Sequence, residues 1–307
     1  MTHGLMFHYF WNEDIRKTQG SIDEKTFSDI LDGYAKGHHL ICASDYVKKA
    51  ISGELKENDV CITFDDGLYS QYAVAEPVLK KKGLTAFFFV YTSPLEGIYE
   101  KIEIFRAFRN SFRTMDDFYL KFFQAAVEYG QKKGVDYAQA INSDTAKAYH
   151  KQYGYYSQND RVYRYLRDIV LKEEYNNLME KMMKECQFDP SIRCKNIWIE
   201  PSQLVELHDK GNVIGLHSHT HPTTLEGMGF EKKKYEYKHN KSLIENLVGG
   251  GVNSASYPCD TYDEETKEIL GSLGIDLAFI AHMEKQEKVM PYRIPRIDAA
   301  AIIRQIL

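Results

Sequence analysis

The most constraining feature of this chain is an apolar run over residues 60–64 that leads directly into Asp65, Asp66 and Gly67. Such a run indicates a buried strand, and the glycine indicates the turn that ends it. The two carboxylates then lie at the carboxyl end of a strand, where barrel and open α/β enzymes place their chemistry. Because neighbouring strand residues point to opposite faces, we expect one aspartate to hold a metal and the other to stay free as a base. A plain surface turn is the alternative, since Asp-Asp-Gly also suits a turn.

The rest of the chain alternates between strand and helix patterns in two blocks. In the first block we predict strands over residues 5–10, 39–42, 60–64 and 84–91, with helices over 21–37, 45–51 and 69–83. The first of these helices opens on a capping box formed by Ser21 and Glu24. In the second block we predict strands over residues 197–200, 212–216, 255–257 and 277–281, with helices over 201–210, 231–247 and 263–273. This alternation is typical of a parallel sheet or barrel.

The alternation stops between residues 98 and 196, where only helical periodicity is visible. We therefore expect one α/β domain over residues 1–97 and 197–307, interrupted by a large helical insertion over 98–196. A length of 307 residues suits one elaborated domain or two domains. The sequence leaves open whether the insertion is a lid, a substrate platform or a dimer surface.

The composition excludes several classes of partner. Lysine and arginine number 39 against 44 acidic residues, a net charge of −5 that argues against a nucleic-acid-binding surface. The five cysteines are irregularly spaced without a CxxC pair, which argues against a zinc ribbon and fits a reducing compartment. The amino terminus lacks a basic leader with a long apolar run, and no stretch approaches the ~18–20 apolar residues of a membrane span. We therefore expect a cytoplasmic protein without a transmembrane segment.

Three histidines, His217, His219 and His221, follow the predicted strand over residues 212–216. In extended backbone such alternating side chains share a face, and in a one-turn loop residues four apart also converge. Imidazole together with carboxylate suits zinc or another borderline divalent ion. Two of these histidines and Asp66 would supply three protein ligands and leave a position open for water and substrate, as catalytic sites require.

These motifs resemble those of the polysaccharide deacetylases, the carbohydrate esterases with NodB homology. Residues 63–67 (Thr-Phe-Asp-Asp-Gly) resemble the first family motif, and residues 217–222 (His-Ser-x-x-His-Pro) resemble the second. Residues 257–259 (Tyr-Pro-Cys) look like a degraded third motif. The resemblance covers both outer parts of the chain, with the motifs in the family's order.

The resemblance implies a distorted (β/α)7 barrel that removes an N-acetyl group from an amino sugar or glycan precursor. By analogy with the family, Asp66, His217 and His221 would hold one divalent metal ion. Zinc is the expected ion, with cobalt, nickel or manganese as alternatives. The first aspartate of the family pair is the catalytic base, and this role falls on Asp65.

The chain departs from the family pattern in three places. The arginine of the third motif would fall at Ser256, and Arg296 is the candidate that replaces it in steadying the base. The tyrosine position is Cys259, whose backbone N–H could still serve the oxyanion. No late Leu-x-His motif, which carries the general acid, is found. Members resembling the poly-N-acetylglucosamine deacetylases use a histidine on the first strand instead, which His8 matches, and His282 is the rival acid.

Two other functions stay open. His217 and His219 also form a His-x-His pair, as in some metal-dependent phosphoesterases and amidohydrolases. The missing arginine and late histidine also fit a sugar-binding barrel that has lost turnover. As partners we expect an N-acetylated sugar, a nucleotide-linked sugar or a lipid-linked sugar, and no nucleic acid. A homo-oligomer is left open.

Overall fold

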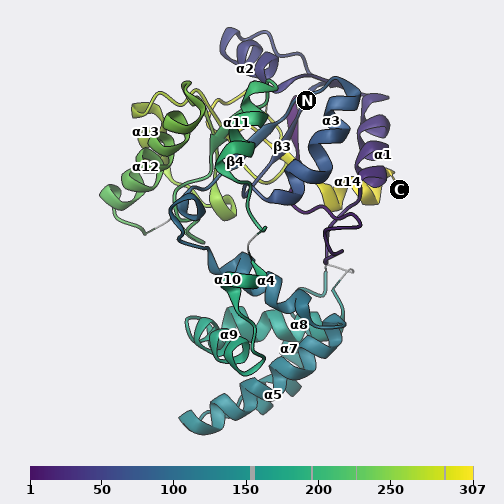
Figure 1. Cartoon of the computed structure of the whole chain (residues 1–307), viewed down its shortest axis with the longest axis vertical. Helices are drawn as coiled ribbons and strands as arrows, with labels where there is room; N and C mark the ends of the chain where they lie inside the picture. The colour runs from purple at the N-terminus through teal and green to yellow at the C-terminus, as the bar shows by residue number, and fades with distance from the viewer. Residues whose placement is uncertain (153–155, 195, 226, 287, 307) are drawn as a thin grey trace. The chain divides into compact units, whose positions relative to one another are not determined.

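The computed structural model describes residues 1–152, 156–194, 196–225, 227–286 and 288–306. The chain divides into two compact units (Figure 1). The first, here called the barrel unit, comprises Met1–Glu100 and Asn196–Leu307. The second, here called the helical unit, comprises Lys101–Lys195. In the described part of the chain, no helix has the length and apolar composition needed to cross a membrane.

The barrel unit is built on parallel strands. Their bounds are β1 (His3–Phe7), β2 (His39–Leu40), β3 (Asp59–Phe64), β4 (Phe87–Val90), β5 (Val213–Leu216), β6 (Ser254–Ser256), β7 (Leu277–Phe279) and β8 (Arg296–Asp298). Seven of them follow the order β7-β6-β5-β4-β3-β1-β8, and β2 pairs with β3 off this path. A parallel bridge between Phe279 and Ile294 links β7 to the segment before β8 and nearly closes the sheet. The predicted (β/α)7 barrel is confirmed.

Helices surround these strands (Figure 1). They are α1 (Glu24–Ala35), α2 (Ala43–Ser52), α3 (Glu76–Lys82), α11 (Pro201–Asp209), α12 (Phe230–Val248), α13 (Glu264–Ser272) and α14 (Ala299–Ile306). Three short helical turns join them, η1 (Gln71–Ala75), η2 (Ser93–Glu96) and η4 (Pro258–Asp260). The capping box predicted at Ser21 is wrong, because Asp23 is the cap and accepts from the backbone N–H of Thr26 at 2.7 Å.

Successive strand residues face alternately the surrounding helices and the barrel interior, as the pleat requires. The outward side chains, such as Ile62 and Phe88, join the large core under the helices. The inward side chains, such as Cys61 and Phe89, form a smaller core together with Tyr46 of α2. The side chain of an odd-numbered residue just after β3 is therefore expected to point into the barrel interior.

Two inward positions require glycine because another side chain passes close to the backbone there. A Cβ at Gly4 would lie 3.1 Å from Cγ of Arg296 and 3.2 Å from Cγ2 of Thr63. A Cβ at Gly215 would lie 2.5 Å from Cδ1 of Phe89. The missing side chains leave room for the stem of Arg296 and for the Phe89 ring inside a narrow barrel.

The strand predicted over residues 197–200 is wrong. Trp198 makes only an isolated antiparallel bridge, to Leu68. The backbone of this segment instead pairs with the turn after β3, since Ile199 N donates to Gly67 O at 2.8 Å and Tyr69 N donates to Ile197 O at 2.8 Å. The apolar run therefore braces the turn that carries the two aspartates.

The helical unit contains α4 (Lys101–Ser111), α5 (Met115–Lys133), α6 (Tyr137–Asn142), α7 (Asp144–Ala148), α8 (Gln158–Tyr165), η3 (Leu166–Leu171), α9 (Glu174–Glu185) and α10 (Pro190–Arg193). Buried aromatic rings fill its interior. Phe118 and Phe122 of α5 both contact the ring of Tyr163 on α8, with centroids 5.5 and 5.0 Å apart. The aromatic residues of this segment thus form a core of their own.

Candidate active site

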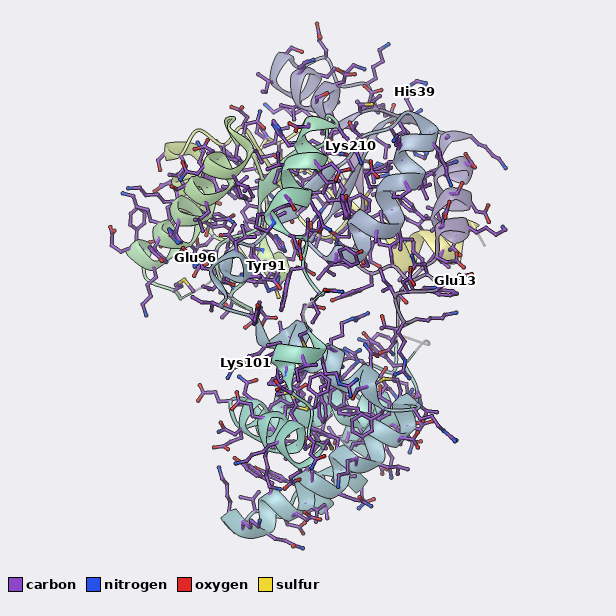
Figure 2. The ribbon with its side chains drawn as sticks, in the orientation of Figure 1. Glu13, His39, Tyr91, Glu96, Lys101 and Lys210 are labelled. Carbon is purple, nitrogen blue, oxygen red and sulfur yellow. The ribbon has the colours of Figure 1, made fainter. Side chains whose placement is uncertain are left out.

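The predicted site residues come from the carboxyl ends of different strands, which meet at one end of the barrel. Asp65 follows β3, His8 follows β1 and His217 follows β5. Figure 2 shows Tyr91 and Glu96, which follow β4, at the end of the barrel unit opposite His39. Parallel strands of a barrel bring their carboxyl ends together, so residues far apart in the sequence become neighbours here.

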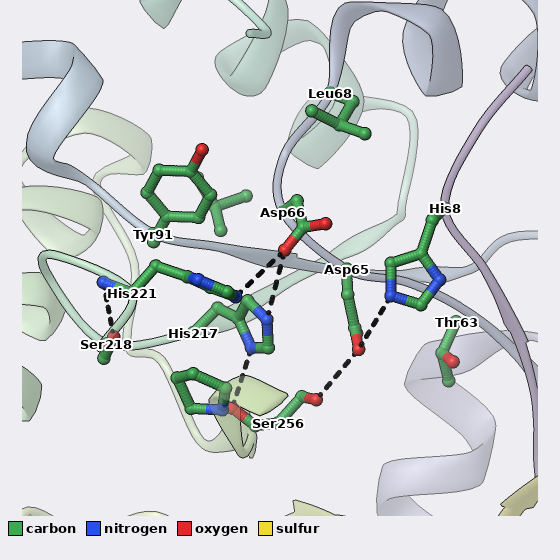
Figure 3. A network of polar contacts seen from close by, with 12 residues as sticks. His8, Thr63, Asp65, Asp66, Leu68, Tyr91, His217, Ser218, His221 and Ser256 are labelled. Atoms are coloured by element: carbon green, nitrogen blue, oxygen red, sulfur yellow. Dashed lines mark hydrogen bonds and ion pairs between the residues drawn. The ribbon is translucent and has the colours of Figure 1, made fainter. Parts of the chain in front are cut away.

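Asp66, His217 and His221 converge on a common point (Figure 3). Oδ1 of Asp66 lies 3.4 Å from Nε2 of His217 and 3.3 Å from Nε2 of His221. Their donor atoms all lie within 4.8 Å of one another. With tetrahedral zinc bonds of about 2.1 Å, neighbouring ligand atoms lie about 3.4 Å apart. These separations match the edges of a zinc site, so the three residues fit a divalent ion.

Left-handed backbone turns aim these side chains. Asp66, Ser218 and His221 have φ values of 75°, 63° and 53°. Such values are uncommon outside glycine and concentrate at functional sites. The turn at Asp66 explains why it does not simply face away from Asp65, as alternation along a straight strand would require. Ser218 Oγ holds the second turn by accepting from His221 N at 3.1 Å.

His217 is held in the tautomer that a metal ligand needs. Its Nδ1 lies 2.9 Å from the carbonyl oxygen of Ser256. A carbonyl only accepts, so Nδ1 carries the proton and the lone pair of Nε2 faces Asp66. The His217 backbone N–H donates to Oδ1 of Asn240 at 3.1 Å, which fixes the start of the loop.

Asp66 is ionised in this environment. Burial acts to raise its pKa, but the His217 and His221 imidazoles that face it outweigh burial and hold the pKa well below its usual range. A metal-binding carboxylate must be deprotonated, and this one already is at neutral pH.

Asp65 is bound to Arg296 instead. Nη1 and Nη2 of the fully buried Arg296 donate to Oδ1 and Oδ2 of Asp65 at 2.7 and 2.8 Å, a bidentate pair. Burial acts to raise the pKa of Asp65, but the charge of the Arg296 guanidinium lowers it below the usual range. Arg296 therefore contacts the predicted base, and its role as the replacement for the third-motif arginine stays a prediction.

Ser256 is a site residue that sequence reasoning treated only as a gap in the family motif. Its Oγ donates to Oδ2 of Asp65 at 3.2 Å and accepts from Nη2 of Arg296 at 2.7 Å. Gln71, which sequence reasoning also missed, donates to the carbonyl oxygens of Asp65 and His8 at 2.5 and 3.0 Å. No local motif marks Ser256, because its partners Asp65 and Arg296 belong to distant parts of the sequence.

His8 lies beside Asp65, whereas His282 is held elsewhere. Nε2 of His8 is 3.9 Å from Oδ2 of Asp65, and Figure 3 shows the ring on the side of Asp65 away from His217. Nδ1 of His282 is 2.6 Å from Oδ2 of Asp260. Of the two candidate acids, His8 is therefore the one in contact distance of the predicted base.

Cys259 lies in the turn η4 with a φ of 51°. Surrounding protein atoms, together with the charge of Asp66, raise the pKa of its thiol to about 11. The oxyanion role of its backbone N–H stays a prediction.

His219 does not join the triad of Asp66, His217 and His221. Its Nδ1 lies 3.0 Å from Oγ1 of Thr92, and its Nε2 lies 3.4 Å from Oε2 of Glu96. The His-x-His alternative needs His217 and His219 to share one ion, but they face different carboxylates. The turn at Ser218 separates them and brings His221 to His217 in place of His219.

Aromatic side chains that the sequence did not predict as site residues lie beside the triad. The Tyr91 ring is 5.1 Å from the His221 ring, and its hydroxyl is hydrogen-bonded to Nε1 of Trp198. Tyr99 stacks on Trp198 at 5.1 Å with an interplanar angle of 8°. Tyr99 is 48% exposed, so the outermost ring of this series, which runs from His221 through Tyr91 and Trp198, lies open to solvent.

The model of the polysaccharide deacetylase family matches residues 52–278. The fold is similar to that of IcaB from Ammonifex degensii (TM-score 0.58, 15% identity, 99% of this chain and 95% of that one). It is similar to the deacetylase PplD of Streptococcus pyogenes in complex with acetate (TM-score 0.56, 15% identity, 97% and 91%). It also resembles a de-N-acetylase from Aggregatibacter actinomycetemcomitans (TM-score 0.55, 13% identity, 100% and 99%). No curated protein matches the chain.

Proposed function

The chain belongs to the polysaccharide deacetylase family, and from that premise we propose that it is a metal-dependent hydrolase that removes the N-acetyl group from an amino sugar. One observation carries the proposal. The triad of Asp66, His217 and His221 and the carboxylate of Asp65 meet at one end of the barrel. A metal-ligand set beside a separate ionised carboxylate is the arrangement that metal-assisted amide hydrolysis needs.

A divalent ion, when bound by the triad, would polarise the acetyl carbonyl and lower the pKa of a water molecule. The mixed nitrogen and oxygen donor set favours zinc, with cobalt, nickel or manganese as alternatives. The bond from His217 Nδ1 to Ser256 O keeps Nε2 free for this purpose. The Asp66 carboxylate would supply the negatively charged ligand of this ion.

Asp65 acts as the general base. It takes the proton of the attacking water through a carboxylate that Arg296 and Ser256 hold in one orientation. The low pKa that Arg296 imposes keeps Asp65 in its proton-accepting form across the neutral range. Cys259 N–H is the candidate donor to the developing oxyanion.

His8 acts as the general acid. An amide nitrogen leaves poorly unless it is protonated, so a donor is chemically required. His8 lies 3.9 Å from Asp65 and is partly open to solvent, which suits a group that donates to a bound substrate and then reloads.

The substrate is proposed to be an N-acetylated sugar, free or linked to a nucleotide or lipid. The exposed ring of Tyr99, supported by Trp198, offers a flat face on which a sugar ring could stack. The PplD structure, which has a similar fold, contains acetate, the second product of N-deacetylation.

Acetate release tests the proposal. The purified chain, loaded with zinc and assayed against N-acetylglucosamine oligomers, a nucleotide-linked N-acetylhexosamine and a lipid-linked one, should release acetate from at least one of them. Zinc content is measured on the same sample. A zinc-loaded chain that binds these sugars without releasing acetate would overturn the proposal and favour a sugar-binding barrel.

A further inference from the structure

A second cluster of histidines and a carboxylate lies outside the candidate active site. It consists of Glu96 at the end of η2, His219 in the loop after β5, and His239 on α12. Their donor atoms lie within 4.8 Å of one another, as in the triad around Asp66. The proposed reaction uses none of these three side chains.

The separations within this cluster suit a metal ion. Nε2 of His219 is 3.4 Å from Oε2 of Glu96, and Nε2 of His239 is 3.1 Å from the same oxygen. The edge of a tetrahedral zinc site is about 3.4 Å with zinc–ligand bonds of about 2.1 Å. The longer contact exceeds the usual range of an N–H···O hydrogen bond, about 2.7–3.2 Å.

Surrounding residues orient the His219 imidazole toward Glu96. The Oγ1 atom of Thr92 accepts from Nδ2 of Asn240 at 3.1 Å and lies 3.0 Å from Nδ1 of His219. A hydroxyl oxygen has two lone pairs, so it can also accept a hydrogen bond from the Nδ1–H of His219, which leaves the lone pair of Nε2 directed at the cluster. Glu236 holds the His219 backbone by accepting from its N–H at 2.9 Å. Such partners behind a ligand are typical of metal sites.

An aromatic ring positions the second histidine. Tyr235 stacks on the His239 ring at 5.1 Å with an interplanar angle of 13°, and it meets His219 edge-on at 5.9 Å. His219 is buried, whereas the side chains of Glu96 and His239 are 37% and 29% exposed. The cluster therefore has a rigid inner ligand and an outer side that an ion can enter from solvent.

We propose that Glu96, His219 and His239 form a second site for a divalent ion of the zinc class. Three protein ligands leave a fourth position for water. The ion would join η2, the loop after β5 and α12. Because His219 lies between two triad ligands in the sequence, this ion would also brace the loop that carries His217 and His221. The inference rests on this cluster alone and does not depend on the proposed reaction.

Metal stoichiometry tests the second site. The full chain is stripped with chelator, reloaded with excess zinc, passed through a desalting column and analysed by mass spectrometry of the metal. Wild type should hold about two zinc ions per chain, and His239→Ala and His221→Ala should each hold about one. The double variant should hold none. His39→Ala is the control, since His39 also contacts a carboxylate, 3.6 Å from Oδ1 of Asp59, at the other end of the barrel unit, and it should still hold two.

A stability measurement gives a second readout. An ion that binds only the folded chain raises its melting temperature. Zinc should therefore raise the melting temperature of His221→Ala, in which only the second site remains, and should have no such effect on the double variant with His239→Ala. Cobalt bound to His221→Ala should give the visible absorption of a tetrahedral site.

The outcomes separate the two sites. If wild type holds one zinc, and His239→Ala and Glu96→Gln hold as much, the second site is overturned, and Glu96 only accepts hydrogen bonds from two imidazoles. If His221→Ala loses zinc and His239→Ala does not, the triad around Asp66 binds the ion and the second site is overturned. If His239→Ala loses zinc and His221→Ala does not, the second site is supported and the proposal of a metal-dependent reaction at the triad is overturned.

Discussion

The barrel end and the helical unit both bury charged groups, but they satisfy them differently. In the helical unit, Nε of Arg164 donates to Oδ1 of the buried Asp160 at 2.9 Å, and the Tyr163 hydroxyl is shared by Tyr175 and Arg109 at 2.6 and 3.3 Å. At the barrel end, Asp66 faces two imidazoles, whose Nε2 atoms are 3.3 and 3.4 Å away.

This difference separates structural polar networks from reactive ones. In the helical unit the Asp160 carboxylate and the Tyr163 hydroxyl have partners at hydrogen-bond distance, which stabilises the fold, and Nε of Arg109 is a buried donor without a partner among the described residues. A cluster of lone pairs aimed at one point is costly to keep unless something binds there. Changes at the barrel end should therefore act on activity, and changes in the helical unit should act on stability.

The largest effect is expected from the triad. Asp66→Asn or His221→Ala removes one of three ligands, so the bound metal should fall well below one ion per triad, and turnover should drop by about 10³-fold or more, because the ion supplies several kcal/mol to the transition state. Metal analysis and acetate release on the same samples measure both effects. If both variants kept full metal and turnover, the ligand assignment would be wrong.

Asp65→Asn should separate the role of Asp65 as base from the role of the adjacent Asp66 as metal ligand. The amide keeps its size and can still contact Arg296, so metal content should stay at the wild-type level. Turnover should fall by about 10²–10⁴-fold, because a positioned base is lost. A variant as active as wild type would exclude Asp65 as the base.

His8→Ala should fold and bind metal but lose turnover by about 10²-fold or more, because the leaving amine is no longer protonated. An acid works only in its protonated form, so the alkaline decline of kcat/KM that it causes should vanish from the residual activity. His282→Ala, whose ring is held by Asp260, should keep the wild-type profile. The reverse result would move the acid to His282.

Arg296→Met should destabilise the barrel by about 3–5 kcal/mol, because it leaves the buried Asp65 carboxylate without its partner. The double variant with Asp65→Asn should recover part of this loss in urea unfolding.

The stability that Asp65 contributes should depend on pH. The pKa of Asp65 is lowered in the folded state, so its contribution to stability is present above the unfolded value of about 3.9 and is lost as the pH falls through the folded value. Asp65→Asn should therefore lose less stability than wild type on acidification below about pH 4.

The smallest effect is expected in the helical unit. Tyr163→Phe removes the hydroxyl that Arg109 and Tyr175 share, which should lower the free energy of unfolding by about 1–3 kcal/mol. Turnover and metal content should stay within about twofold of wild type, because no reacting group is touched. A large loss of turnover without loss of stability would break the comparison between the two units.

The sequence by itself determined the parts that depend on short-range geometry. The apolar run before Asp65 and Asp66 predicted a strand ending in a turn, and β3 ends at Phe64. The alternation of strand and helix patterns predicted the barrel. These features follow from local backbone sterics and from the burial of apolar residues at regular spacing, both of which can be read within a short window.

Only the tertiary structure decided which side chains meet. Arg296 lies 231 positions after Asp65, and its contact depends on the register of β8 with β1 and on the space that Gly4 leaves. The left-handed turn at Ser218 separates His219 from His217 and brings it to Glu96. Residues 197–200 have a strand-like pattern, yet they pair with the turn after β3. Long-range register and backbone turns set these contacts, and a short sequence window contains neither.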